Sequence, residues 1–179
     1  MSMHTRVVAM AAAVLLGAGS LALAPAASAA PPKYHGIDGD RGTVTDDWQD
    51  EENLGVDDHT KSNATALWQT VLWADRAEWQ DEDGDSHTFE KSQIDGEFGP
   101  ETESATQWWQ DNFGLSDNDG VVTEQTWRAA QAHLSGPTRS RTVTYNGAQK
   151  ASFKRISDKY QVRLKGTGPF KNASYDTLG

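Results

Sequence analysis

Residues 94–110 read IDGEFGPETESATQWWQ, and residues 118–131 repeat the same plan as NDGVVTEQTWRAAQ. In both stretches an Asp-Gly pair is followed by an apolar residue, a threonine and a run with helical spacing. Glycine tolerates backbone conformations that strain other residues, and aspartate hydrogen-bonds to N–H groups just downstream. The sequence therefore predicts two equivalent turns, each leading into a helix. The residues expected to build these turns are Asp95, Gly96, Phe98, Gly99, Asp119 and Gly120.

Helical spacing predicts three helices. The first lies within residues 62–79, where the apolar side chains share one broad face. The second begins at Pro100, whose missing N–H costs nothing at the first helical position, and ends at Gly114. The third lies within residues 123–134. Seven tryptophans and no cysteine mean that an apolar core, without disulfides, must hold these helices together.

The amino-terminal segments are expected to lie outside this core. Residues 1–29 are predicted to be a signal peptide, because an apolar run follows Arg6 and ends at Ala27-Ser28-Ala29, a typical cleavage site. An uncleaved membrane anchor is the alternative. Residues 30–53 are rich in Gly, Asp and Glu and are expected to form a flexible acidic leader.

Residues 138–179 differ from the preceding chain in charge and pattern. They hold 9 Lys and Arg against 2 acidic residues, whereas residues 31–137 hold 6 against 24. The Asn146-Gly147 pair between two strand-like runs predicts a basic β-hairpin extension, with a disordered tail as the alternative. The acidic body should repel nucleic acid. The basic end either contacts an anionic polymer or rests on that body.

These motifs resemble the small three-helix peptidoglycan-binding domain. Residues 54–137 are assigned to this domain, although an insertion at about residues 76–93 departs from the family pattern. The residues that carry the resemblance are Trp68, Gln69, Leu72, Asp95, Gly96, Phe98, Gly99, Thr102, Ala105, Trp109, Gln110, Gly114, Leu115, Asp119, Gly120, Val122 and Thr126. The resemblance implies a mainly α fold, a three-helix bundle with a small C-terminal β-extension.

The candidate ligand-binding residues are aromatic and amide side chains. Trp108 is expected to point outward, because its neighbour Trp109 takes the core position and successive helical residues diverge by about 100°. Trp73 is a second aromatic candidate, although burial in the core is equally consistent with its position. Gln69 and Gln110 are expected either to bind ligand amides or to satisfy backbone groups between the helices.

No group of residues has the full spacing of a known metal-binding motif. Asp81, Asp83 and Asp85 alternate as in a calcium loop, but Ser86 replaces the required glycine, so a solvated acidic loop is favoured. His35 and the other histidines are scattered without a zinc pattern. No cofactor and no catalytic motif is therefore expected.

The sequence favours a secreted, non-catalytic bacterial module that binds peptidoglycan or another cell-wall polymer as a monomer. It is expected outside the cell or on the wall, with no nucleic-acid partner and no membrane association after signal cleavage. The alternatives are a small cell-wall hydrolase with catalytic groups outside residues 54–137, and a secreted inhibitor or interaction protein that uses the fold without binding sugar.

Secreted material should begin at Ala30, because cleavage after Ala29 satisfies the small-residue rule and keeps Pro31 away from the scissile bond. N-terminal sequencing of the exported protein checks this. A retained Met1 would contradict it.

Overall fold

The computed structural model describes residues 34–39, 42–136 and 141–179, which belong to one compact unit. The predicted signal peptide lies outside these residues. Within the described part of the chain, no helix has both the length and the apolar character needed to span a membrane.

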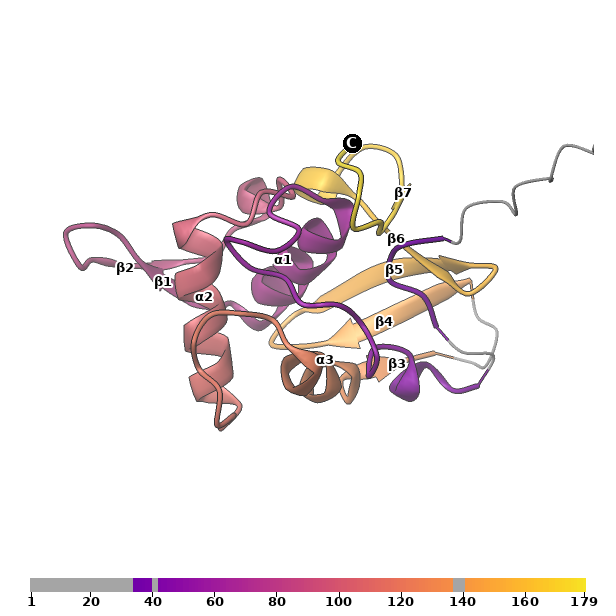
Figure 1. Ribbon diagram of the computed structural model, residues 1–179, viewed down its shortest axis with the longest axis horizontal. Coiled ribbons are helices and arrows are strands. Elements are labelled where there is room, and N and C mark those ends of the chain that lie inside the picture. Colours follow the sequence, from indigo (N-terminus) through magenta and orange to yellow (C-terminus); the bar gives the residue numbers. More distant parts are fainter. Residues whose placement is uncertain (1–33, 40–41, 137–140) are drawn as a thin grey trace, which may run out of the picture. The chain divides into compact units, whose positions relative to one another are not determined.

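The three predicted helices are present. They are α1 (Asn63–Asp75), α2 (Pro100–Asn112) and α3 (Glu124–Gln131). The Ser62 hydroxyl caps α1 by accepting a hydrogen bond from the Thr65 N–H at 3.0 Å. Short 3-10 helices are η1 (Val44–Asp46), η2 (Lys91–Gln93) and η3 (Leu164–Gly166). Figure 1 shows α1 lying between α2 and the large sheet.

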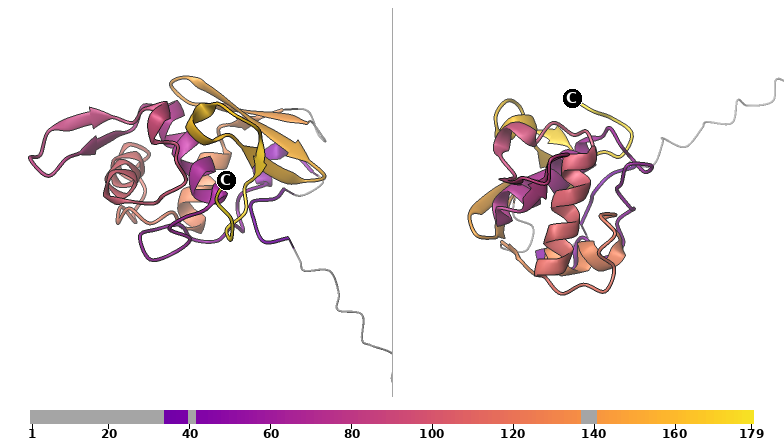
Figure 2. Two further views of the ribbon diagram at one scale, coloured as in Figure 1. Left: turned by 90° about the horizontal axis from the view of Figure 1, so that it is seen from above. Right: turned by 90° about the vertical axis from the view of Figure 1, so that its left-hand side faces the viewer.

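The described residues also form two antiparallel sheets. The smaller is the hairpin of β1 (Glu78–Gln80) and β2 (Ser86–Thr88), within the predicted insertion. The larger has the order β3-β4-β5-β6-β7. Its strands are β3 (Leu134–Ser135), β4 (Thr142–Asn146), β5 (Lys150–Ile156), β6 (Lys159–Val162) and β7 (Lys171–Asn172). Figure 1 and the left view of Figure 2 show that the small hairpin extends beyond α2, away from the large sheet.

The β4–β5 turn contains the predicted Asn146-Gly147 pair. Asn146 pairs with Lys150, so residues 147–149 connect the strands. A Cβ on Gly147 would lie 2.8 Å from the Ala74 carbonyl oxygen, which explains glycine there. The Gln149 N–H donates to the same carbonyl at 2.8 Å. The hairpin is thus fastened to the end of α1.

Aromatic rings connect the helices to the sheet. Trp68 of α1 contacts Trp109 of α2 and Trp127 of α3 edge-on, with centroids 5.2 and 5.5 Å apart. Trp127 contacts Trp48, just after η1, at 5.6 Å. Trp48 in turn contacts Phe153 of β5 at 5.7 Å and Tyr160 of β6 at 5.5 Å. All six side chains are buried, so one core runs from α2 to the large sheet.

The expectation of a mainly α three-helix bundle with a small C-terminal β-extension is wrong. The structure combines three helices with seven strands in the described residues, and the larger sheet supplies one wall of the core. The physical reason lies in the alternation of β5, where Ala151, Phe153 and Arg155 are buried between exposed neighbours. Strand residues of this kind complete the burial of Trp48, which the helices alone do not cover.

A buried ion pair fastens the segment before α1 to this sheet. Arg155 Nη2 of β5 lies 3.0 Å from Asp47 Oδ1, and both side chains are almost fully buried. The Tyr160 hydroxyl donates to the other Asp47 oxygen at 2.5 Å. The same amino-terminal segment also contacts the C-terminal segment, because the Ile37 N–H donates to the Ala173 carbonyl at 2.8 Å.

Asp47→Ala should lower the free energy of unfolding by about 3–5 kcal/mol, because it leaves the Arg155 charge buried without this carboxylate. The exposed Asp50 provides the matched control. Asp50→Ala should change stability by less than about 0.5 kcal/mol. Urea titration of the two variants checks this, and equal losses would contradict the structural role of the pair.

Candidate functional site

The first Asp-Gly turn is bound by a glutamine of the preceding helix. Gln69 Oε1, on α1, accepts a hydrogen bond from the Gly96 N–H at 2.7 Å. Gln69 Nε2 donates to the Glu97 carbonyl and to Asp95 Oδ1, each at 3.0 Å, and to Thr102 Oγ1 at 3.1 Å. Both polar atoms of this buried side chain are therefore engaged within the protein.

The second turn repeats these contacts with Gln110 of α2. Its Oε1 accepts from the Gly120 N–H at 3.0 Å, and its Nε2 donates to the Val121 carbonyl at 2.8 Å. It also donates to Thr126 Oγ1 at 3.2 Å. Asp119 Oδ1 accepts from the Val121 N–H at 3.0 Å, as Asp95 Oδ1 does from the Glu97 N–H at 2.9 Å. The repeated sequence thus encodes a repeated glutamine-bound turn.

The turn glycines are required by backbone geometry. Gly96 and Gly120 have φ of +80° and +81°, in the region that favours glycine. A Cβ at Gly96 would lie 2.8 Å from the Ser62 carbonyl oxygen, and one at Gly120 would lie 2.9 Å from that of Glu103. The remaining turn residues are Phe98, which is buried, and Gly99, which precedes the first residue of α2.

Trp108 lies half-buried in a shallow hollow of about 240 Å³ between α2 and the β1–β2 hairpin. The Gln80 N–H of β1 donates to Ser104 Oγ of α2 at 3.0 Å, which fixes the spacing of the two walls. The other lining residues are all polar: Glu78, Gln80, Ser86, Ser104, Gln107 and Asp111. The hollow therefore offers one aromatic surface beside carboxylate, amide and hydroxyl groups, a combination suited to a hydroxyl-rich ligand.

Trp73 lines a different hollow, of about 320 Å³, beside the large sheet. Lys91 Nζ lies 4.3 Å from the centroid of the Trp73 ring. The Arg163 guanidinium lies 4.1 Å from the centroid of Phe170, and Lys150 also lines the hollow. This hollow combines aromatic rings with three cations, so it favours an anionic ligand.

A third hollow, of about 240 Å³, borders the outside of the first Asp-Gly turn. Gln69 and Asp95 contribute to it, together with Glu97 and Glu101. The structure therefore does not bring the four predicted ligand-binding residues together. Trp108, Trp73 and Gln69 line three separate hollows, and the Gln110 amide lies inside the second turn.

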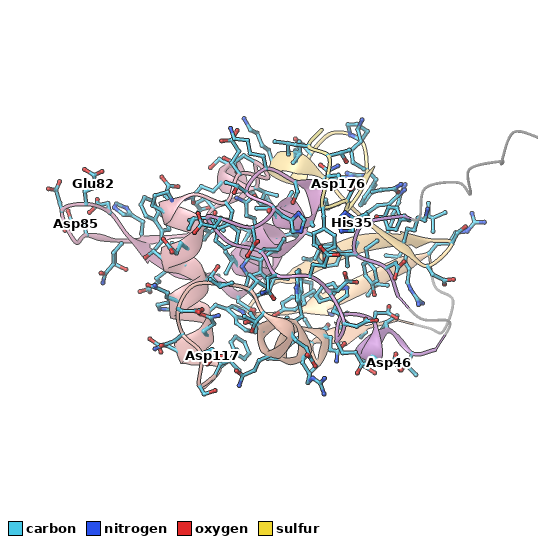
Figure 3. All side chains as sticks on the ribbon, in the orientation of Figure 1. His35, Asp46, Glu82, Asp85, Asp117 and Asp176 are labelled. Atoms are coloured by element: carbon cyan, nitrogen blue, oxygen red, sulfur yellow. The ribbon has the colours of Figure 1, made fainter. Side chains whose placement is uncertain are left out.

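The acidic loop of the sequence forms the tip of the β1–β2 hairpin. Asp81 Oδ1 accepts hydrogen bonds from the N–H groups of Asp83 and Asp85, at 3.1 and 2.9 Å. Its other oxygen lies 2.8 Å from His87 Nε2, and this contact lowers the pKa of Asp81. Figure 3 shows Glu82 and Asp85 at this tip. The Asp81 carboxylate is thus engaged in shaping the turn.

An acidic hollow that sequence reasoning missed lies between the leader and the C-terminal segment. It measures about 360 Å³ and is lined by Tyr34, His35, Gly36, Asp38, Asp50, Glu51, Glu52 and Tyr175. Burial raises the pKa of Glu51 to about 8, although hydrogen bonds from Tyr175 and the Asp38 N–H oppose the shift. Hydrogen bonds with Asp176 and Glu52 raise the pKa of His35. No spacing in the sequence indicated that these residues would meet.

The comparisons with known proteins identify one part of the chain. A family model described as "Putative peptidoglycan binding domain" matches residues 86–130. No curated protein and no solved structure gives a significant match. The matched segment holds α2, both Asp-Gly turns and nearly all of α3. The match supports peptidoglycan binding in general and an association with the cell wall. Residues 86–130 are therefore the peptidoglycan-binding-like part of this chain, as the motifs around the two turns predicted.

Proposed function

We propose that this protein is a secreted, non-catalytic module that binds peptidoglycan as a monomer. The family match over residues 86–130 supports the ligand class. The predicted signal peptide, residues 1–29, supports export. Ligand binding requires a surface that is open and chemically suited to sugar and peptide groups, and the hollow around Trp108 is our candidate.

The position of the Trp108 hollow is the observation that carries the proposal. Five of its seven lining residues lie within the matched segment, namely Ser86, Ser104, Gln107, Trp108 and Asp111. Carboxylate and amide oxygens accept hydrogen bonds from sugar hydroxyls, while a tryptophan face offers a flat apolar surface for a sugar ring. The acidic lining disfavours a polyanion and suits a hydroxyl-rich chain.

Gln69 and Gln110 act in this proposal as positioning residues. Gln110 lies on the same helix as Trp108, and its amide fixes the turn that leads out of that helix. Gln69 fixes the turn that leads into it. The two amides therefore hold both ends of the helix that presents Trp108.

The hollow around Trp73 is proposed as a second, electrostatic contact. Lys91, Lys150 and Arg163 line it, and all three side chains are exposed. Carboxylate or phosphate groups of a wall polymer would be attracted there. Because exposed charges are screened over about 8–10 Å at physiological ionic strength, this contribution should weaken with salt. The contribution of Trp108 should not.

One observation bears on the interaction-protein alternative. The β1–β2 hairpin lies in the predicted insertion and forms one wall of the Trp108 hollow. A protein partner that covered this wall would use the hairpin itself, whose tip carries Glu82 and Asp85 (Figure 3). Wall binding that survives deletion of the tip would favour the sugar-binding proposal.

Trp108→Ala should weaken binding to purified, washed cell walls about tenfold at high salt, a change of about 1.4 kcal/mol. Co-sedimentation at low and high salt measures it. Asn112→Ala is the matched control, because Asn112 is exposed on the same helix and does not line the hollow. The control should bind as the unaltered protein does.

A second variant tests the electrostatic contribution of the Trp73 hollow to wall binding. Arg163→Glu should reduce sedimentation with walls at low salt and leave it unchanged at high salt. If the unaltered protein stays in the supernatant at both salt concentrations, wall binding is excluded. Equal binding by Trp108→Ala and Asn112→Ala would instead show that the Trp108 hollow is not the site.

A further inference from the structure

Two histidines and a glutamate from the segment before α1 converge on one point. His35 Nε2 lies 2.7 Å from Glu52 Oε1, and His59 Nε2 lies 3.0 Å from Glu52 Oε2. One donor atom from each of the three residues lies within 4.8 Å of the other two. No other part of the described chain holds such a group of potential metal ligands. Imidazole nitrogens with a carboxylate are typical ligands of zinc.

The second ring nitrogen of His35 has the partner expected of a metal ligand. His35 Nδ1 lies 2.8 Å from Asp176 Oδ2, and Figure 3 shows the two residues side by side. A histidine that binds a metal usually donates its other N–H to a carboxylate, which leaves the first nitrogen free to coordinate. With Nδ1–H bound to Asp176, the lone pair of His35 Nε2 is directed toward Glu52 and His59.

The three residues are held in place by the surrounding fold. The Tyr175 ring contacts both imidazoles, with centroids 5.3 Å from His35 and 4.7 Å from His59. The Glu52 N–H donates to the Tyr175 hydroxyl at 3.0 Å, and the Glu52 carbonyl accepts from Trp127 Nε1 at 2.8 Å. Glu52 is therefore fixed from both sides by buried aromatic residues.

The His59 backbone is also constrained. Its φ of +48° is uncommon for a residue other than glycine. The Thr65 hydroxyl of α1 donates to the His59 carbonyl at 2.9 Å and holds this conformation. Uncommon backbone conformations held by their surroundings cluster at functional sites. Here the conformation places the imidazole beside Glu52.

The electrostatics of the cluster also favour a cation. Glu52 and Asp176 place two carboxylates against the two imidazoles, within 2.7–3.0 Å of their ring nitrogens. A divalent ion held by the lone pairs of the two Nε2 atoms would balance the charges of these two carboxylates. The acidic residues Asp38 and Asp50 of the adjacent hollow add to the attraction for a cation.

We propose that His35 Nε2, His59 Nε2 and the Glu52 carboxylate bind one zinc ion, with Asp176 orienting His35. Three protein ligands leave one coordination position for water or for an oxygen of a ligand in the adjacent hollow. The ion would connect the leader directly to the start of α1, and to the C-terminal segment through Asp176. This proposal is independent of peptidoglycan binding.

The test uses the purified mature chain after removal of metals with a chelator. Titration calorimetry with zinc chloride should show one ion bound per chain, and zinc should raise the melting temperature. Magnesium and calcium, which prefer oxygen ligands, should do neither. Binding should weaken as the pH is lowered, because metal ligands must be deprotonated and protons compete with the ion.

Variants distinguish this site from adventitious binding. His59→Gln should abolish stoichiometric zinc binding, and Asp176→Asn should weaken it about 10–100-fold, as expected for a residue that orients a ligand. His87→Gln is the matched control, because His87, like His59, lies beside one carboxylate, here that of Asp81 on the hairpin at 2.8 Å. It should bind zinc as the unaltered protein does.

Circular dichroism of metal-free His59→Gln will show whether this variant still folds. If His59→Gln is unfolded, the zinc affinity of Asp176→Asn tests the proposal instead. The proposal is overturned if the unaltered chain binds no zinc or binds calcium equally well. It is also overturned if His87→Gln loses as much affinity as His59→Gln, or if Asp176→Asn binds with unchanged affinity while remaining folded.

Discussion

The geometry of the helical part depends on a neutral amide placed inside each Asp-Gly turn. A turn of this kind leaves a backbone N–H and a carbonyl oxygen facing the interior, and each unsatisfied buried group would cost about 1–3 kcal/mol. Glutamine carries one acceptor and two donors on a single planar group, so one side chain satisfies both. Gln69 thereby fixes the turn between α1 and α2, and Gln110 fixes the turn between α2 and α3. A carboxylate in the same place would lack the donors.

The rest of the structure completes a core that these helices leave open. Three short helices present more indole surface than they can cover, and Trp48 and the β5–β6 strands cover the remainder. The acidic leader and the basic strands meet at Asp47 and Arg155, where opposite charges lie buried together. One pair of the opposite charges that separate the acidic leader from the basic strands is therefore used in a buried ion pair.

Local patterns predicted the local structure well. The helices, the two Asp-Gly turns and the hairpin at Asn146-Gly147 follow from capping, spacing and glycine chemistry. The fold class did not follow, because the contact of Trp48 with β5 and β6 joins segments about a hundred residues apart. For the candidate site, helical phase predicted that Trp108 is more exposed than Trp109. The convergence of His35, Glu52 and His59 could not be predicted, because no spacing in the sequence marks it.

The pairing of the two ends has a consequence for the order in which the chain folds. The Ile37 N–H bonds to the Ala173 carbonyl, and the Ser174 hydroxyl bonds to the carbonyl of His35. These contacts close a loop that contains almost the whole compact unit, and loops of this length are slow to close. The residues of the unit that are synthesised first therefore cannot pair until the residues synthesised last are available. The contacts of residues 35 and 37 with residues 173 and 174 can therefore form only after the rest of the compact unit has been synthesised.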